Sequence, residues 1–317
     1  MRAMRILFIG NTRIGDFILA SGLLDHLLNI HPDARVTLAC GPSCIGLTRH
    51  IPNLERVIAM RKRPRHGHWF DLWREVVRTR WDLVVDLRKS GVSYALLSRD
   101  THRLRRSKDQ HKVEEAGAIL GLSPPPDPKV WIGEDDRAHA RALVPDGAPY
   151  IVFGPGATHI HKTWPAERFA ELAALLIAPD GPLPGGRIVL LGAPNERPEA
   201  EPTLRALPEA SRIDLMDKAN LLQAGAVIER AALYIGNDNG QMHLAAATGT
   251  PTIGLFGPTP AQLYGPWGKN CRAVATDTPY EELAPLLRDS VEKHYGLMET
   301  LPVDKVLQAA REMLARG

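Results

Sequence analysis

Residues 5–40 read RILFIGNTRIGDFILASGLLDHLLNIHPDARVTLAC, and this stretch decides the fold class. The run 5–10 is short and apolar, as in a buried strand, whereas residues 16–32 carry apolar side chains at helical spacing. Pro32 and Asp33 end that helix, and a second strand-length run follows at 35–40. A strand, a helix and a second strand in this order predict a parallel sheet with helices packed on its faces.

The same alternation continues along the chain and then restarts. The sequence predicts further strands at 56–60, 82–87, 150–157, 187–192, 232–237 and 251–257, and helices at 69–80, 111–122, 165–178, 223–231, 242–249 and 303–316. SPPPDP at 123–128 cannot continue a helix and begins a connector. We therefore expect an α/β protein with two doubly wound domains, at 1–145 and 146–300. We expect the last segment, 301–317, to be a helix that packs back on the first domain.

Composition and charge exclude several classes of protein. The 44% hydrophobic and 24% charged content is ordinary for a globular protein, and no apolar run approaches the length of a membrane span. The three cysteines complete no metal-ligand set and are typical of a reducing compartment, and RILFIG at 5–10 is too short for an export signal, so we expect no metal and a cytoplasmic location. GNTRIGD at 10–16 is not the dinucleotide-binding GxGxxG pattern, and we expect no cofactor. Residues 1–148 hold 24 Lys and Arg against 17 Asp and Glu, whereas residues 149–317 hold 15 against 19. The basic first half suits an anionic partner such as an acidic lipid surface or a phosphorylated substrate, and the absence of aromatic residues among its basic runs argues against nucleic acid.

Loops that follow strands are the places to search for a site, since ligands of doubly wound sheets bind beyond the carboxyl ends of the strands. GNTRIGD at 10–16 follows the first strand, and its glycines, Gly10 and Gly15, permit a tight turn close to a ligand. Asp16 lies where the helix begins. Its side chain is either a helix N-cap or a general base for an attacking hydroxyl.

GPGATHIHKTWP at 154–165 follows the first strand of the second half. Two glycines at an expected helix start leave backbone amides available to an anion, and Thr158 and Lys162 add a hydroxyl and an ammonium group. The loop therefore predicts a phosphate or pyrophosphate site, although it lacks the Walker pattern. Glu196, which follows the next strand, is a weaker candidate for binding a ribose diol.

YIGNDNGQMHLAAATGTPTIGLFGPT at 234–259 places polar residues between a buried strand and a helix of small residues. Asp238, Asn239 and Gly240 open that helix, and we expect its amides and dipole to favour a negative group. Asp238 is alternatively a helix cap. His243 is either a core histidine or a donor to a phosphate oxygen.

These runs together resemble glycosyltransferase family 9, the bacterial ADP-heptose:lipopolysaccharide heptosyltransferases. The resemblance is carried by GNTRIGDFILASGLLDHLLNIHPDA, FGPGATHIHKTWPAERFAEL and GNDNGQMHLAAATGTPTIGLFGPT with the later YGPWG, and DLVVDLRKSGVSYALLSR is similar as well. It implies a GT-B fold of two Rossmann-like domains that face each other across a cleft. It further implies inverting, metal-independent transfer of a heptose from an ADP-heptose to an acidic glycolipid of the lipopolysaccharide core. The implied location is the cytoplasm, at the cytoplasmic face of the inner membrane, and peripheral contact with that membrane is left open.

The same resemblance assigns roles to individual residues. Asp16 would be the catalytic base, and Lys162 would be catalytic as well as donor-binding, meeting the diphosphate with Thr158. The remaining donor-binding residues would be Gly15, Glu196 at the ribose, Met216 at the adenine, and Asp238, Asn239, Gly240 and His243 at the sugar and phosphates. The basic loops suggest acceptor contacts at Arg61, Lys62, Arg63, Arg88 and Lys89.

The chain departs from the family pattern at two places. Ala20-Ser21 stands where a Thr-Pro pair is common, and Asn239 stands where Thr or Ser is common, which leaves the exact sugar open. Three alternatives also stay open: a sugar-nucleotide epimerase of the same fold, a non-catalytic nucleotide-sugar-binding protein, and a transferase that uses another nucleotide sugar or an acceptor other than lipopolysaccharide.

Overall fold

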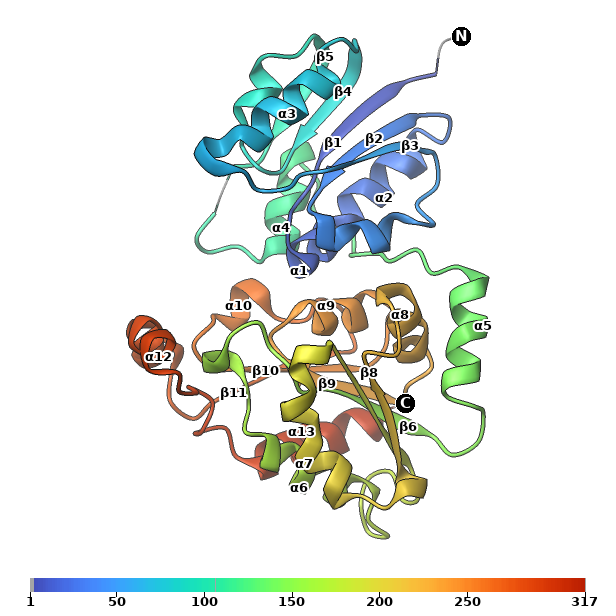
Figure 1. The fold of residues 1–317 in the computed structure, drawn as a ribbon, viewed down its shortest axis with the longest axis vertical. Coiled ribbons are helices and arrows are strands. Elements are labelled where there is room, and N and C mark those ends of the chain that lie inside the picture. The colour runs from blue at the N-terminus through green and yellow to red at the C-terminus, as the bar shows by residue number, and fades with distance from the viewer. Residues whose placement is uncertain (1–2, 106, 317) are drawn as a thin grey trace. The chain divides into compact units, whose positions relative to one another are not determined.

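A computed structural model describes residues 3–105 and 107–316. The chain forms two compact units, which meet in sequence between Trp131 and Ile132 and are called here the N-terminal and the C-terminal unit (Figure 1). Among the described residues, no helix is long and apolar enough to cross a membrane.

The N-terminal unit is built on a parallel sheet of five strands in the order β3-β2-β1-β4-β5. The strands are β1 (Arg5–Ile9), β2 (Arg35–Cys40), β3 (Leu54–Ala59), β4 (Trp81–Asp86) and β5 (Ser98–Arg103), and the helices are α1 (Ile14–Leu19), α2 (Ser21–Ile30), α3 (Gly67–Val76) and α4 (Lys112–Gly117). Four of these strands were predicted. β5 was missed because its sequence, SRDTHR, is polar and lies at the sheet edge.

Both faces of this sheet are buried, as the unbroken apolar run in β1 requires. Leu7 and Ile9 point to one face, where they share a core with Leu72 and Val76 of α3. α1, α2 and α4 pack against one another and cover the other face. The expected helix 16–32 is divided at Ala20, where the Ser21 hydroxyl donates to the Ile18 carbonyl oxygen and bends the chain.

The C-terminal unit has a parallel sheet of six strands in the order β11-β10-β9-β6-β7-β8. The strands are β6 (Tyr150–Gly154), β7 (Arg187–Gly192), β8 (Arg212–Met216), β9 (Leu233–Asn237), β10 (Thr252–Phe256) and β11 (Cys271–Ala275). The helices are α5 (Glu134–Leu143), α6 (Ala166–Ile177), α7 (Arg197–Ala206), α8 (Leu221–Glu229), α9 (Gly240–Ala247), α10 (Ala261–Tyr264), α11 (Tyr280–Leu283), α12 (Leu287–Lys293) and α13 (Val303–Leu314).

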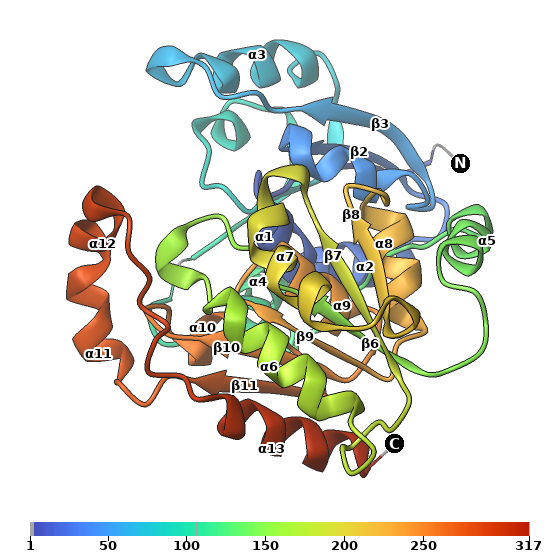
Figure 2. The same ribbon diagram turned by 60° about the horizontal axis from the view of Figure 1, so that its bottom comes forward.

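The larger core of this unit lies between the sheet and α6, α7 and α13, while α8 and α9 cover the opposite face (Figures 1 and 2). Trp164 is fully buried in that core, and its indole N–H donates to the Leu301 carbonyl oxygen at 2.9 Å. The core thereby fixes the loop that leads from β6 into α6. This arrangement brings the carboxyl ends of the neighbouring strands β6, β9 and β10 together at the same end of the sheet.

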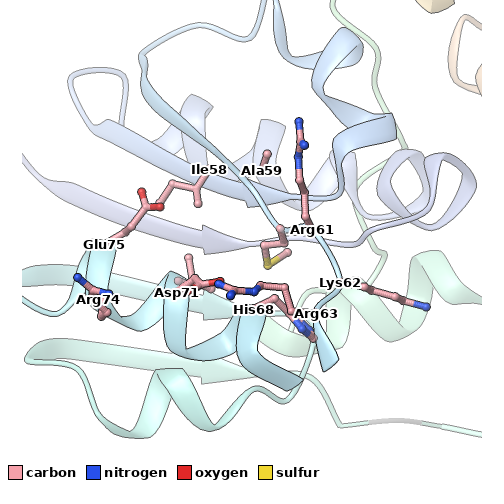
Figure 3. Close-up of a pocket in the computed structure, with 11 residues that line it drawn as sticks. Ile58, Ala59, Arg61, Lys62, Arg63, His68, Asp71, Arg74 and Glu75 are labelled. Atoms are coloured by element: carbon pink, nitrogen blue, oxygen red, sulfur yellow. The ribbon is translucent and has the colours of Figure 1, made fainter. Parts of the chain in front are cut away.

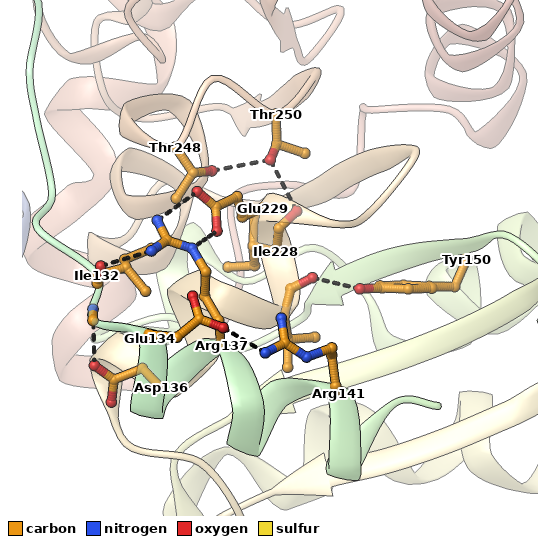
Figure 4. Close-up of polar contacts among 12 residues, drawn as sticks. Ile132, Glu134, Asp136, Arg137, Arg141, Tyr150, Ile228, Glu229, Thr248 and Thr250 are labelled. Carbon is orange, nitrogen blue, oxygen red and sulfur yellow. Dashed lines mark hydrogen bonds and ion pairs between the residues drawn. The ribbon is translucent and has the colours of Figure 1, made fainter. Parts of the chain in front are cut away.

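Two expectations about the domains differ from the structure. The helix α13 belongs to the C-terminal unit, where it packs on α6, β9 and β11 and where Val306 and Ala310 are fully buried, whereas we expected it to pack back on the first domain. The C-terminal unit also begins earlier than residue 146, because α5 packs against α8. Arg137 of α5 donates to both carboxylate oxygens of Glu229, at 2.8 and 3.1 Å (Figure 4).

Candidate functional site

The candidate donor site begins with an ion pair at the carboxyl edge of the second sheet. Lys162, in a short 3-10 turn at 160–162 after β6, places its Nζ 2.6 Å from Oδ2 of Asp238, which follows β9. The Thr259 hydroxyl, after β10, donates to the same carboxylate oxygen at 2.8 Å. Asp238 is buried, whereas Lys162 keeps 23% of its side chain exposed. The carboxylate therefore holds a partly accessible ammonium group at the point where three neighbouring strands end.

The start of α9 is capped by Asn239 and not by Asp238. The Asn239 side-chain oxygen accepts hydrogen bonds from the backbone amides of Gln241 and Met242, at 2.9 and 3.0 Å. Its side-chain nitrogen donates to the Gly156 carbonyl oxygen at 2.6 Å. Two amides of the first helical turn are thus already satisfied, so fewer of them remain for a ligand than the sequence suggested. Asn239 instead joins the loop after β9 to the loop after β6.

The loop after β6 needs its glycines for packing. A Cβ atom on Gly154 would overlap the Tyr234 hydroxyl, and a Cβ on Gly156 would overlap the Glu196 carboxyl group. Neither glycine has a positive φ, and α6 begins only at Ala166, so these glycines do not directly precede the helix as expected. Thr158 is exposed on the same loop.

Glu196 and Met216 lie side by side, as an adenosine subsite would require. A Cβ atom on Gly192, at the end of β7, would meet both the Met216 methyl group and Glu196 Oε2. Glu196 Oε2 accepts a hydrogen bond from the Ala193 amide at 2.8 Å. Burial raises the pKa of the Glu196 carboxyl, the Ala193 amide opposes that shift, and the charge of Glu199 adds to it.

His243 occupies the fourth position of α9 and is 5% exposed. This burial agrees with the alternative that His243 is a histidine of the core. Gly240 is the first residue of the same helix. The roles of both residues toward a donor stay predictions.

In the N-terminal unit, Asp16 is the third residue of α1, and the N-cap is Arg13, whose side chain makes no capping hydrogen bond. The capping alternative for Asp16 is therefore wrong, and Gly15 is the helical residue before it. The turn is held by its neighbours: the Asn11 side chain donates to the Asp16 carbonyl oxygen at 3.0 Å, and Gly41 N donates to the Asn11 carbonyl oxygen at 3.1 Å. Asp16 is half-buried on this tethered turn, so its position is well defined.

The basic loop after β3 lines an open pocket of about 740 Å³ between β3 and α3 (Figure 3). Its cationic lining residues are Arg61, Lys62, Arg63 and Arg74, and its acidic ones are Asp71 and Glu75. Arg63 is neutralised by Asp71 at 2.7 Å. The pKa of His68 in the pocket is lowered by burial first, then by the charges of His66, Arg88 and Lys62, while Asp71 opposes the shift. The pocket is therefore electropositive and suits an acidic ligand.

The model of glycosyltransferase family 9 (heptosyltransferase) matches residues 94–295. The chain belongs to glycosyltransferase family 9. It is 25% identical to lipooligosaccharide heptosyltransferase 2 of Haemophilus influenzae, over 99% of this chain and all of that one. It is 26% identical to lipopolysaccharide heptosyltransferase 1 of Salmonella typhimurium, over 91% of this chain and 98% of that one.

Solved structures confirm the GT-B fold expected for a family 9 glycosyltransferase. A family 9 member from Veillonella parvula aligns with a TM-score of 0.79 at 23% identity, covering 99% of this chain and 98% of that one. The Escherichia coli ADP-heptose lipopolysaccharide heptosyltransferase II aligns with a TM-score of 0.75 at 21% identity, covering 99% of both chains.

Sequence reasoning assigned no role to three residues that shape the sites of this family 9 enzyme. Thr259 ends the stretch 234–259 and Tyr234 begins it, but Thr259 was given no role and Tyr234 was only part of the expected strand 232–237. Asp86, at the end of β4, is fully buried and accepts hydrogen bonds from Arg88 N and from the amide and hydroxyl of Ser90, at 2.8–2.9 Å. It fixes the turn that carries Arg88 and Lys89. The signal was present, since an aspartate after an apolar strand and before Ser90 is typical of such a turn.

Proposed function

We propose that this glycosyltransferase moves a heptose from an ADP-activated heptose to an acidic acceptor of the lipopolysaccharide-core type, with inversion at the anomeric carbon and without a metal. The observation that supports it best is the Lys162–Asp238–Thr259 cluster, with Glu196 after β7 and Met216 at the end of β8, at the carboxyl ends of the strands of the same sheet. The curated relatives carry the names of lipopolysaccharide and lipooligosaccharide heptosyltransferases, and one solved relative from Escherichia coli is described with ADP bound.

In this proposal the C-terminal unit binds the donor. The Lys162 ammonium and the Thr158 hydroxyl contact the diphosphate, the Glu196 carboxylate accepts from the ribose diol, and Met216 packs against the adenine. The diphosphate gains negative charge as the anomeric bond breaks. A fixed ammonium group stabilises that charge without reorganisation, which is the role the Asp238 contact prepares Lys162 to play.

The N-terminal unit supplies the base and the acceptor site. The Asp16 carboxylate takes the proton of the acceptor hydroxyl while that oxygen forms the new bond to the anomeric carbon, and ADP departs with the electrons of the broken bond. A single displacement of this kind inverts the anomeric centre. Arg61 and Lys62 in the electropositive pocket bind acidic groups of the acceptor, and Arg88 and Lys89 extend that charge. The enzyme would then act at the cytoplasmic face of the inner membrane.

The test compares ADP-, GDP- and UDP-linked sugars by thermal shift, followed by turnover with a lipopolysaccharide-core acceptor in the presence and absence of EDTA. A ligand that binds only the folded state at about a hundred times its Kd adds roughly 2.7 kcal/mol of stability, so the true donor raises Tm clearly. We expect ADP-heptose to give this shift, a transferred heptose of inverted configuration, and EDTA-resistant turnover. Stabilisation by GDP- or UDP-sugars alone, conversion of the donor without transfer, or no turnover with any acceptor would overturn the proposal.

A further inference from the structure

The N-terminal unit exposes three large apolar side chains around α3. Phe70 on α3 is 59% exposed, and Tyr94 and Leu97, in the segment before β5, are 75% and 72% exposed. These exposures exceed that of every other large hydrophobic residue in the part of the chain that the structure describes. Isolated surface apolar residues need no explanation, so the question is whether these three belong to one surface.

Trp73 links Phe70 to the segment that carries Tyr94 and Leu97. Its ring stacks on Phe70, with centroids 5.7 Å apart, and its indole N–H donates to the Ala95 carbonyl oxygen, between Tyr94 and Leu97 in the sequence. Within the N-terminal unit, Figure 2 shows α3 on the outside, with no other helix of that unit over it. Phe70, Tyr94 and Leu97, together with Trp73, are called here the aromatic face.

Two arginines lie beside the rings of this aromatic face. The Arg103 guanidinium lies 3.7 Å from the centre of the Tyr94 ring, and that of Arg74 lies 6.0 Å from the centre of the Phe70 ring. Residues 61–105, which contain the face and its surroundings, hold twelve Lys and Arg against five Asp and Glu. Two of these carboxylates already have partners: Asp86 is buried and accepts hydrogen bonds within its own turn, and Asp71 forms an ion pair with Arg63. The surface around the aromatic face is therefore strongly positive.

This combination suits a lipid surface better than a protein partner. Arginine and aromatic residues are enriched together in protein interfaces as well, so their pairing alone does not choose between the two partners. The excess of twelve Lys and Arg over five Asp and Glu in residues 61–105 favours a continuous anionic surface. At the level of lipid headgroups, aromatic rings and arginine side chains are stable together, because the ring and the aliphatic stem contact apolar matter while the guanidinium meets phosphate. Anionic headgroups also match the positive surroundings.

We propose that the aromatic face docks the enzyme on a bilayer that contains anionic phospholipid, with Phe70, Tyr94 and Leu97 at the depth of the headgroups. This inference deepens the proposed function, since a glycolipid acceptor would lie in the same bilayer, but it does not depend on catalysis. The docking surface is formed by side chains of the N-terminal unit alone.

The test is cosedimentation of the full-length protein with vesicles of phosphatidylcholine alone or mixed with phosphatidylglycerol, without acceptor or donor. We expect binding to the mixed vesicles, a decrease in binding as salt is added, and little binding to phosphatidylcholine alone. The variant Phe70→Ser/Tyr94→Ser/Leu97→Ser should bind the mixed vesicles about tenfold more weakly or less. The matched control Ile30→Ser/Leu286→Ser/Val291→Ser removes three other exposed apolar side chains and should bind like the wild type.

Circular dichroism and ADP-sugar thermal shift verify that both variants are folded. Turnover with a delipidated, water-soluble acceptor should be the same in the triple variant and in the wild type, which separates docking from chemistry. A wild-type protein that stays in the supernatant with anionic vesicles at low salt would overturn the inference, as would a triple variant that binds as well as the control. Vesicle binding by a protein that transfers no heptose would refute only the proposed function.

Discussion

The Lys162 ammonium lies 2.6 Å from a carboxylate oxygen of Asp238, and the Thr259 hydroxyl binds the same oxygen. Residues 162, 238 and 259 come from loops after three adjacent strands, β6, β9 and β10, so the sheet order itself creates the contact. A buried carboxylate that fixes a partly exposed ammonium has a clear use in a transferase. In the proposed mechanism it would position one positive charge for the departing diphosphate and keep that charge from relaxing into solvent.

Removal of that ammonium should impair both binding and chemistry. For Lys162→Ala we expect kcat to fall by about 10²–10³, the usual loss for one charge-stabilising donor, together with weaker ADP binding. Lys218→Ala is the matched control, because Lys218 is an exposed lysine of the same unit that donates to the Asp214 carbonyl oxygen. Steady-state kinetics and ADP titration calorimetry measure the effect. Unchanged affinity for ADP would refute the contact with the diphosphate.

The proposed base should act on turnover and not on donor binding. For Asp16→Asn we expect transfer to fall by about 10²–10⁴, the range attributed to general base catalysis, while affinity for the ADP-sugar stays close to that of the wild type. Asp33→Ala changes an exposed aspartate in the same unit and should leave both quantities unchanged. Near-normal turnover of Asp16→Asn would show that another group removes the proton.

The elements that the sequence predicted best are those whose burial dictates their composition. β1, β2 and β7 are buried apolar runs, and the amphipathic helices α3, α6 and α13 appear within a few residues of their expected limits. Three strands, β5, β8 and β11, and five helices, α5, α7, α10, α11 and α12, were missed. These strands lie at sheet edges, where only part of the chain is buried and the period-two pattern is weak. α7 contains Pro202, which argues against a helix in any sequence pattern.

The contacts of the candidate site were also predicted only in part. Position after a strand identified Lys162, Asp238 and Glu196, since parallel topology determines which loops share an edge. It did not identify their partners. Whether Asp238 or Asn239 caps α9 depends on the backbone between them, and the Thr259 contact joins residues 21 positions apart, so neither follows from local sequence.

The raised pKa of Glu196 predicts a pH dependence of both stability and donor binding. Burial favours the protonated carboxyl in the folded protein, so the folded state binds more protons than the unfolded state between the unfolded pKa and the raised folded value. This group's contribution therefore makes the protein less stable as pH rises through that window. Donor affinity should change in the opposite sense, because the carboxylate is the better acceptor for a ribose diol.

Glu196→Gln should remove both effects. We expect its urea midpoint to exceed that of the wild type at pH values above the folded pKa of Glu196 and to match it in acid, while its donor affinity no longer varies over that range. Glu201→Gln, at a carboxylate of α7 that is 40% exposed, is the control and should keep the wild-type pH profile. Identical pH profiles for Glu196→Gln and wild type would contradict this assignment.

The placement of α5 in the C-terminal unit predicts where that unit can be cut. A fragment that begins at residue 132 retains α5 and the contact of Arg137 with Glu229, whereas one that begins at 146 loses both and exposes the side of α8 that α5 covers. We expect the longer fragment to unfold cooperatively in urea and the shorter one to be less stable and prone to aggregation. Equal midpoints for the two fragments would show that α5 contributes little to the unit.

The Tyr234 hydroxyl provides a test of how tightly the β6 loop is packed. It is fully buried, no hydrogen-bond partner is found for it among the described residues, and burial raises its pKa well above the ordinary value. Because an unsatisfied buried hydroxyl costs about 1–3 kcal/mol, Tyr234→Phe should leave the free energy of unfolding unchanged or increase it.

Gly154→Ala should be strongly destabilising, since its methyl group would overlap that hydroxyl and crowd the Gln241 side chain. Overpacking of this kind typically costs about 1–3 kcal/mol. In the double variant Gly154→Ala/Tyr234→Phe the closest overlap is gone, although the ring carbon that bore the hydroxyl still crowds the methyl group. We therefore expect a partial rescue, measured as a favourable coupling energy in a double-mutant cycle of urea unfolding. Strict additivity of the two substitutions would mean that the hydroxyl and the glycine are not in contact.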